Sequence, residues 1–207
     1  MKRFTAIALA TAMALSLTAC GSNIGDIELS AEQNGLYIEN DGTVTYGICT
    51  SFDKDYFDED KLEEEVKAEI EEYNQGDTAS VPDAITFDSL DLDDGVITLV
   101  TNFATDYDLV SYCKQYNQYS GDEFYVGNIG GCTADIKGDF VSAEDESVVK
   151  GKDIKKMSDM IVVVSDVYKV QIDGQILYTN NCTIDDGIIT TASSENGKSF
   201  IVYKLDE

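Results

Sequence analysis

Cysteine thiols are the strongest nucleophiles in this chain, which has five cysteines and no histidine. Without histidine, a serine or cysteine nucleophile lacks its most common general base, and a metal site lacks its most common ligand. The sequence contains no C-x-x-C pair, so a thioredoxin-like dithiol is not expected. We therefore expect Cys49, Cys113, Cys132 and Cys182 to have structural roles, either in disulfides or as buried thiols. The fifth cysteine, Cys20, has a different context.

A serine-lysine pattern is present at Ser111-Tyr112-Cys113-Lys114. It matches S-x-x-K, in which a lysine lies beside a serine nucleophile in penicillin-recognising enzymes. The partner motifs Lys-Thr-Gly and Ser-Asp-Asn are absent from the sequence. Because about one such match is expected by chance in a chain of this composition, we assign it no catalytic role.

Carboxylates are abundant, with 40 aspartates and glutamates. A pair of them could hydrolyse glycosides, but no spacing singles out one pair. The stretch Asp53-Lys54-Asp55 begins like an EF-hand loop, yet Asp58 stands at the sixth position, where that loop needs glycine. The acidic stretch 91–95 is better explained as a turn. We expect no catalytic carboxylate pair, no metal site and no cofactor, and leave weak surface Ca²⁺ binding as an alternative.

The first 19 residues have the features of a signal peptide. Lys2 and Arg3 precede an apolar run over residues 6–17, which is shorter than the roughly 20 residues that span a bilayer. The following Leu17-Thr18-Ala19-Cys20 stretch resembles the lipobox of bacterial lipoproteins. In that family the cysteine is diacylated on sulfur and becomes the first residue after cleavage. The resemblance implies lipidation at Cys20 and a location on the extracytoplasmic face of the cell membrane; the alternative is a secretory signal cut near Ala19.

The chain after the leader is strongly acidic. Two of the 14 basic residues lie in the leader, which leaves 12 lysines against 40 acids and a net charge near −28. Nucleic acid is therefore excluded as a partner, because its binding begins with neutralisation of phosphates. Residues 20–34 are mostly small and polar, and we expect a lipidated cysteine and a flexible tether with a reach of about 20 Å. Residues 35–207 should form a single acidic domain.

One basic cluster interrupts this acidic composition. It consists of Lys150, Lys152, Lys155 and Lys156, a third of the lysines after the leader. Such a cluster could contact anionic lipid or a wall polymer. The interpretation that we favour is charge compensation within the molecule, either of an acidic helix or of a loop kept in water.

Four Asp-Gly pairs predict β-hairpins, because Asp-Gly readily adopts the positive φ angles of a type I′ turn. In the third hairpin, a two-residue loop would place Val170 opposite Leu177. Met160 to Val164 and Phe200 to Lys204 add further strands. The predicted pairs are 36–40 with 43–52, 84–91 with 96–104, 168–172 with 175–179, and 181–184 with 188–192.

Two amphipathic helices are predicted between these strands. In residues 58–73 the apolar positions recur with helical spacing, Asp58 can cap the first turn, and Phe57 and Leu62 have the spacing of a hydrophobic staple. In residues 106–119, Thr105 and Asp108 form a capping box. An amphipathic helix needs an apolar surface to cover, so the fold class is α+β: a mostly antiparallel, twisted β-sheet with two helices packed on it.

The chain after Cys20 is similar to small, acid-rich lipoproteins of anaerobic Gram-positive bacteria, in the stretches "FDKDYFDEDKLEEEVKAEIEEYN", "QILYTNN" and "FIVYK". That resemblance implies a setting and no activity. We expect a non-enzymatic, membrane-tethered domain that binds an unknown envelope protein or glycan. The alternatives are a solute-binding lipoprotein of a transporter, which needs a deep cleft, and a carboxylate-dependent envelope hydrolase.

Overall fold

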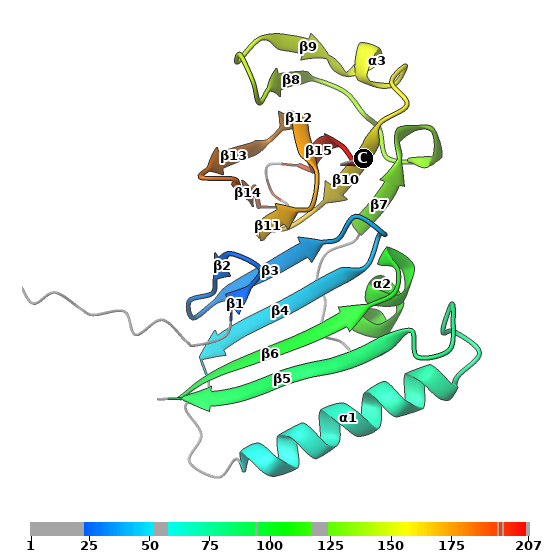
Figure 1. Cartoon of the computed structure of the whole chain (residues 1–207), viewed down its shortest axis with the longest axis vertical. Helices are drawn as coiled ribbons and strands as arrows, with labels where there is room; N and C mark the ends of the chain where they lie inside the picture. The colour runs from blue at the N-terminus through cyan, green and yellow to red at the C-terminus, as the bar shows by residue number, and fades with distance from the viewer. Residues whose placement is uncertain are drawn as a thin grey trace, which may run out of the picture.

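The computed structural model describes residues 23–51, 58–93, 95–116, 124–193, 195 and 197–205, and in these residues it has two large β-sheets, one two-stranded sheet and three α-helices. The two sheets follow one another along the long axis of the molecule (Figure 1). Nearly all neighbouring strands are antiparallel, and one pair is parallel. The predicted fold class, α+β with mostly antiparallel strands, is confirmed.

The larger sheet has seven strands and contains three of the four predicted hairpins. Gly42, Gly95 and Gly187 adopt positive φ angles between the paired strands, which is the backbone conformation that Asp-Gly was expected to supply. β11 and β3 form the parallel pair. The strand order is β13 (Cys182–Asp185), β14 (Ile188–Thr191), β11 (Lys169–Ile172), β3 (Gln33–Ile38), β4 (Val44–Ser51), β6 (Val96–Phe103) and β5 (Ile85–Asp93).

The smaller sheet has six strands, and all of its neighbouring strands are antiparallel. Two of its strands come from the stretches that the sequence predicted, Met160 to Val164 and the C-terminal run. The order is β7 (Phe124–Asn128), β10 (Met160–Val164), β15 (Ser199–Lys204), β12 (Gln175–Asn180), β8 (Asp139–Ser142) and β9 (Val148–Lys150).

The predicted hairpin 168–172 with 175–179 is wrong, because β11 belongs to the larger sheet and β12 to the smaller one. Val170 lies opposite Ile189 and Leu36, not opposite Leu177. Gly174 lacks the positive φ of the other three turns. The Asp173 amide instead donates to the Ile38 carbonyl at 2.8 Å, and a Cβ on Gly174 would lie only 2.7 Å from the Lys204 carbonyl oxygen. At this Asp-Gly pair the chain crosses from the larger sheet to the smaller one.

A central core joins both sheets and the two longer helices. On β10, Val162 and Val164 enter this core, whereas Ile161 and Val163 point to a second core on the opposite face. Strands with both faces buried read as continuous apolar runs, as "MIVVV" does. Residues of the segment between β7 and β10, including Phe140 and Ile154, cover the outer face of the smaller sheet.

Both predicted helices form, with small differences at their ends. α1 (Glu59–Gln75) buries Val66, Ile70 and Tyr73 on one face, as expected. Asp58 occupies the N-cap position, as predicted, but its side chain makes no capping hydrogen bond and pairs with Lys61 at 3.2 Å. Phe57 lies outside the described residues. In the described ranges, no helix is long and apolar enough to cross a membrane.

The second helix, α2 (Asp106–Gln115), ends before the predicted residue 119. Half of its predicted capping box is confirmed, because the Asp108 amide donates to Thr105 Oγ1 at 3.1 Å. The Asp108 carboxylate accepts from the Thr105 hydroxyl at 2.5 Å, where a complete box would have it accept from the Thr105 amide. A third helix, α3 (Gly151–Ile154), is a single turn beside β9. A 3₁₀ turn, η1 (Ile129–Gly131), follows β7.

The expected flexible tether over residues 20–34 is wrong from residue 23 onward. Residues 23–34 fold onto the outer face of the larger sheet through β1 (Asn23–Ile24) and β2 (Ile27–Glu28). Ile24, Ile27 and Leu29 are each at most 2% exposed. The apolar side chains determine this packing, because burying them stabilises the fold more than leaving them in water.

Two glycines create the surface on which this N-terminal hairpin packs. Gly35 and Gly47 face each other across β3 and β4. A Cβ on Gly47 would overlap Ile24 and lie 2.8 Å from Leu29 Cδ1. The hairpin is also fixed at its turn, where the Asp26 amide donates to Gln171 Oε1 at 2.8 Å and Gln171 Nε2 donates to Asp26 Oδ2 at 2.8 Å.

We therefore predict that Gly47→Ala lowers the free energy of unfolding by about 1–3 kcal/mol, because the added methyl group displaces the Ile24 side chain from its packing position against β4. Urea unfolding followed by circular dichroism measures the change. Gly130→Ala is the control, since a Cβ there meets no atom within 4 Å. Equal stability of the two variants would show that the hairpin is not held by this contact.

Candidate functional site

Two adjoining pockets lie on the smaller sheet, at the end of the molecule that carries β9 and α3 (Figure 1). They share Lys137 and Gly138. We call the first, of about 540 Å³, the Asn pocket; it is lined by Asp135, Lys137, Gly138, Asn180, Asn181, Gly197, Lys198 and Phe200. We call the second, of about 620 Å³, the lysine pocket; it is lined by Ile136, Lys137, Gly138, Asp139, Lys150, Gly151, Lys152 and Lys155.

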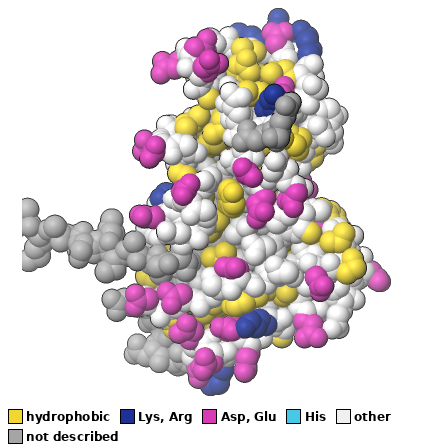
Figure 2. All heavy atoms as spheres, in the orientation of Figure 1, with side chains coloured by type: hydrophobic (Ala, Val, Ile, Leu, Met, Phe, Trp, Pro, Cys, Tyr) yellow, Lys and Arg dark blue, Asp and Glu magenta, His cyan; other side chains and the backbone are white. Residues whose placement is uncertain are grey.

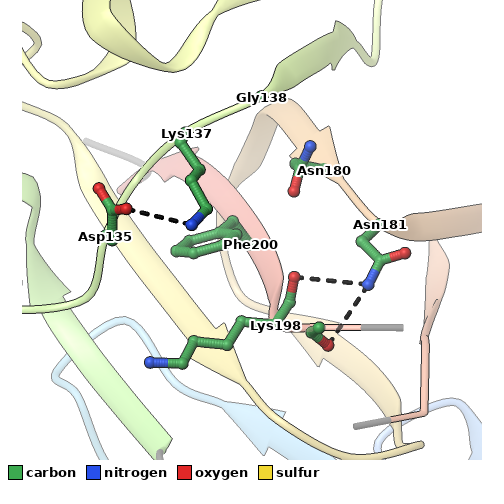
Figure 3. A pocket seen from close by; sticks show the side chains of 8 residues that line it. Asp135, Lys137, Gly138, Asn180, Asn181, Lys198 and Phe200 are labelled. Carbon is green, nitrogen blue, oxygen red and sulfur yellow. Dashed lines mark hydrogen bonds and ion pairs between the residues drawn. The ribbon is translucent and has the colours of Figure 1, made fainter. Parts of the chain in front are cut away.

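Hydrogen bonds to backbone carbonyls position the two asparagines of the Asn pocket. Asn180, at the end of β12, donates through Nδ2 to the Asp139 carbonyl at 2.6 Å. Asn181 has a positive φ of 60° and donates through Nδ2 to the carbonyls of Gly197 and Lys198, both at 3.4 Å (Figure 3). Asparagine tolerates this left-handed conformation better than most residues. The amides are therefore held in fixed positions at the rim.

The floor of the Asn pocket is apolar and its rim is charged. Phe200 is 4% exposed, and Figure 3 shows the Lys137 side chain reaching past its ring toward Asp135. Asp135 accepts ion pairs from Lys137 at 3.2 Å and from Lys155 at 3.3 Å. These two lysines hold the pKa of Asp135 below its usual range. All three side chains are exposed, so the pairs contribute little stability.

Positive charge exceeds negative charge around the two pockets. Among the described residues, the combined lining has five lysines and two aspartates, a local charge of +3 in a chain whose net charge is −26. Asp139 pairs with Lys150, and Lys152 makes no ion pair with any described residue. Figure 2 shows dark-blue side chains gathered at this end of the molecule.

The structure divides the basic cluster that the sequence indicated. Lys150, Lys152 and Lys155 line the lysine pocket, whereas Lys156 pairs with Asp153 at 2.6 Å and lines neither pocket. The expected charge compensation occurs, but it comes from nearby aspartates and not from the acidic helix α1.

Sequence reasoning missed the remaining pocket residues. Lys137, Lys198 and the Asn180-Asn181 pair lie far from the basic cluster in the chain, and the pairing of β12 with β8 and β15 brings them together. The adjacent Asn180 and Asn181, directly after a strand, were a local signal for a polar turn.

None of the four cysteines in the described residues lines either pocket, although Cys182 Sγ donates to the carbonyl of the pocket residue Asn180 at 3.3 Å. Cys49, Cys113, Cys132 and Cys182 form no disulfide with one another, and the first two are buried. Burial raises the pKa of the Cys113 thiol to about 12 and that of Cys182 to about 11. These two thiols are protonated near neutral pH and are poor nucleophiles. Cys20, the expected lipidation site, lies outside the described residues.

The remaining chemical candidates do not assemble into a site. Ser111 and Lys114 of the S-x-x-K pattern lie on α2 and line neither pocket. Asp53 and Asp55, the start of the EF-hand-like stretch, lie outside the described residues. Within the described part of the chain, no group of three or more His, Cys, Asp or Glu side chains is arranged to hold a metal ion.

One carboxylate, Asp108, is fully buried, and it belongs to the core. It accepts hydrogen bonds from Tyr73 Oη at 3.1 Å, the Ser80 amide at 2.9 Å, and the hydroxyls of Ser80 and Thr105. Burial and the nearby charge of Asp108 raise the pKa of Tyr73 well above its usual value. This network ties the end of α1, the loop after it and the start of α2 together, so Asp108 is structural.

Comparison with known proteins gives no guide to function. No protein-family model matches the chain, and neither a curated protein nor a solved structure matches it significantly.

We predict that Asp108→Ala lowers the free energy of unfolding by about 3 kcal/mol, because the buried hydroxyl of Tyr73 loses its acceptor. Asp88→Ala is the matched control, since Asp88 is exposed on β5. Urea unfolding of both variants measures the difference. A loss below about 1 kcal/mol for Asp108→Ala would contradict the structural role of this network.

Proposed function

We propose that this protein is a lipid-anchored, extracytoplasmic binding domain without enzymatic activity, and that its ligand occupies the Asn pocket. The observation that carries the proposal is the lining of that pocket. Fixed amides, two lysines and an aspartate from three separate segments surround an apolar floor. A concave site with a few convergent polar groups is typical of ligand binding.

The two alternative functions fit this arrangement less well. A hydrolase of the glycosidase type needs two carboxylates, whereas the described lining of the Asn pocket has one, Asp135, which is paired with two lysines. A transport-associated solute-binding protein commonly closes two lobes around its ligand. Here one central core runs through both sheets, and the Asn pocket lies on the smaller sheet alone.

The anchor is tested at Cys20. We predict that cells fed a radioactive fatty acid label the wild-type protein and leave Cys20→Ser unlabelled, because the lipid is attached through that sulfur. The label is measured on the immunoprecipitated protein after gel electrophoresis. Equal label in both proteins would remove the lipid anchor and the location that depends on it.

The binding site is tested with two matched double variants. The test protein is the chain 20–207 carrying Cys20→Ser, which contains every described residue. Asn180→Ala with Lys198→Ala alters the Asn pocket; Gln175→Ala with Lys204→Ala alters the other ends of β12 and β15, where those two residues pair. We predict that immobilised wild-type protein and the Gln175/Lys204 variant retain the same cell-envelope component, and that the Asn180/Lys198 variant loses it.

Melting temperatures of both variants serve as the folding control for this experiment. If the Asn180/Lys198 variant melts normally and retains the component as well as wild type does, the Asn pocket is not the binding site. If wild type retains nothing from the envelope, the binding function itself is refuted.

A further inference from the structure

We infer that the ligand is an anionic, hydroxyl-bearing polymer that runs through the Asn pocket into the lysine pocket. This inference rests on the proposed binding function and adds the chemical class of the ligand and its path. It uses the five lysines that line the two pockets and the fixed amides of the first.

The shape of the boundary between the pockets permits a continuous ligand. Lys137 and Gly138 line both pockets. Gly138 has a positive φ of 86°, and a Cβ there would meet Asn180 Nδ2 at 3.4 Å. Because glycine has no side chain, none projects from this position between the two pockets. A chain of linked units can therefore pass from one pocket to the other.

The charges select for repeated negative groups. Asp135 is shared by Lys137 and Lys155, so one carboxylate cannot neutralise both ammonium groups. Lys152 is exposed and makes no ion pair with the described residues, so it is open to a ligand anion. A polymer with several negative groups can form a favourable contact with each lysine, and it releases its own counterions when it binds.

The polar groups of the Asn pocket account for the hydroxyls. Asn180 uses Nδ2 to bond the Asp139 carbonyl, which directs its amide oxygen to act as an acceptor for ligand O–H groups. The described lining of the lysine pocket has four lysines and no side-chain amide. The Asn pocket is therefore suited to the hydroxyl groups of such a polymer, and the lysine pocket is suited to its negative charges.

A flat anionic bilayer fits this end of the molecule less well than a polymer. The turn between β8 and β9 carries Glu144, Asp145 and Glu146 at the end of this hairpin that lies opposite the lysine pocket. A planar surface would meet these acids together with the lysines, whereas a chain can enter the pockets and avoid the turn. The acidic helix α1, with eight acids and two lysines, lies at the other end of the long axis (Figures 1 and 2).

The test is calorimetric titration of the chain 20–207 carrying Cys20→Ser with three polymers: poly(glycerol phosphate), polygalacturonate and uncharged dextran. The first two probes distinguish phosphate from carboxylate as the source of charge. We expect at least one of them to bind, with an affinity that falls by about tenfold between 50 and 200 mM salt, and dextran not to bind. Binding of dextran as tight as that of either polyanion would overturn the inference.

Variants locate the binding. Lys137→Gln with Lys152→Gln should weaken polyanion binding by at least about tenfold, because two ammonium contacts are lost. Lys61→Gln with Lys67→Gln removes the same charge from α1 and should leave the affinity within about twofold. Lys137→Arg with Lys152→Arg keeps the charge and should bind, which separates a charge effect from a folding defect. Equal losses in the Lys137/Lys152 and Lys61/Lys67 glutamine variants would mean that net charge, and not the pockets, drives binding.

Two further outcomes separate this inference from the proposed function. If neither polyanion binds while an envelope component is retained through the Asn pocket, the ligand class is wrong and the binding function stands. If vesicles of phosphatidylglycerol bind through Lys137 and Lys152 while both polymers fail, the surface recognises lipid and the polymer is excluded.

Discussion

The close contact at Asp173 and Gly174 is the constraint on which the arrangement of the two sheets depends. The Asp173 amide bonds to the end of β3, and the absent side chain of Gly174 lets the carbonyl of Lys204 approach. The chain thus leaves the larger sheet and enters the smaller one within two residues. Because β12 then pairs with both β15 and β8, this crossing also places Asn180 next to the segment that carries Lys137.

Local signals were enough to predict the helices and three hairpins. The apolar face of α1, the capping box at Thr105 and the positive φ angles of three Asp-Gly glycines are properties of short segments. The Asp-Gly pair at residues 173 and 174 carries the same local signal, yet β11 pairs with β14 and with β3, which lies more than 130 residues earlier in the chain. Which distant strands pair with each other depends on how the whole core packs, and the sequence of the turn alone does not reveal it.

Only those residues of the candidate site that are neighbours in the chain were apparent from the sequence, and the role favoured for them was charge compensation. The lysines after β9 formed a visible cluster, whereas Lys137, Lys198 and the asparagines come from segments that only the smaller sheet unites. The N-terminal segment was misjudged for a different reason. Its polar composition suggested a tether, but Ile24, Ile27 and Leu29 are enough to fill the space above Gly35 and Gly47.

That N-terminal hairpin has a consequence for how the proposed anchor would act. Only Gly21 and Ser22 stand between Cys20 and the first residue of β1, a span of about 10 Å at most. A lipid at Cys20 would then hold the outer face of the larger sheet close to the bilayer and restrict tumbling of the domain. This short connection would prevent the domain from reversing its orientation relative to the bilayer. The lysine-lined end would then stay at a nearly constant distance from the membrane surface and contact only a thin layer of the envelope.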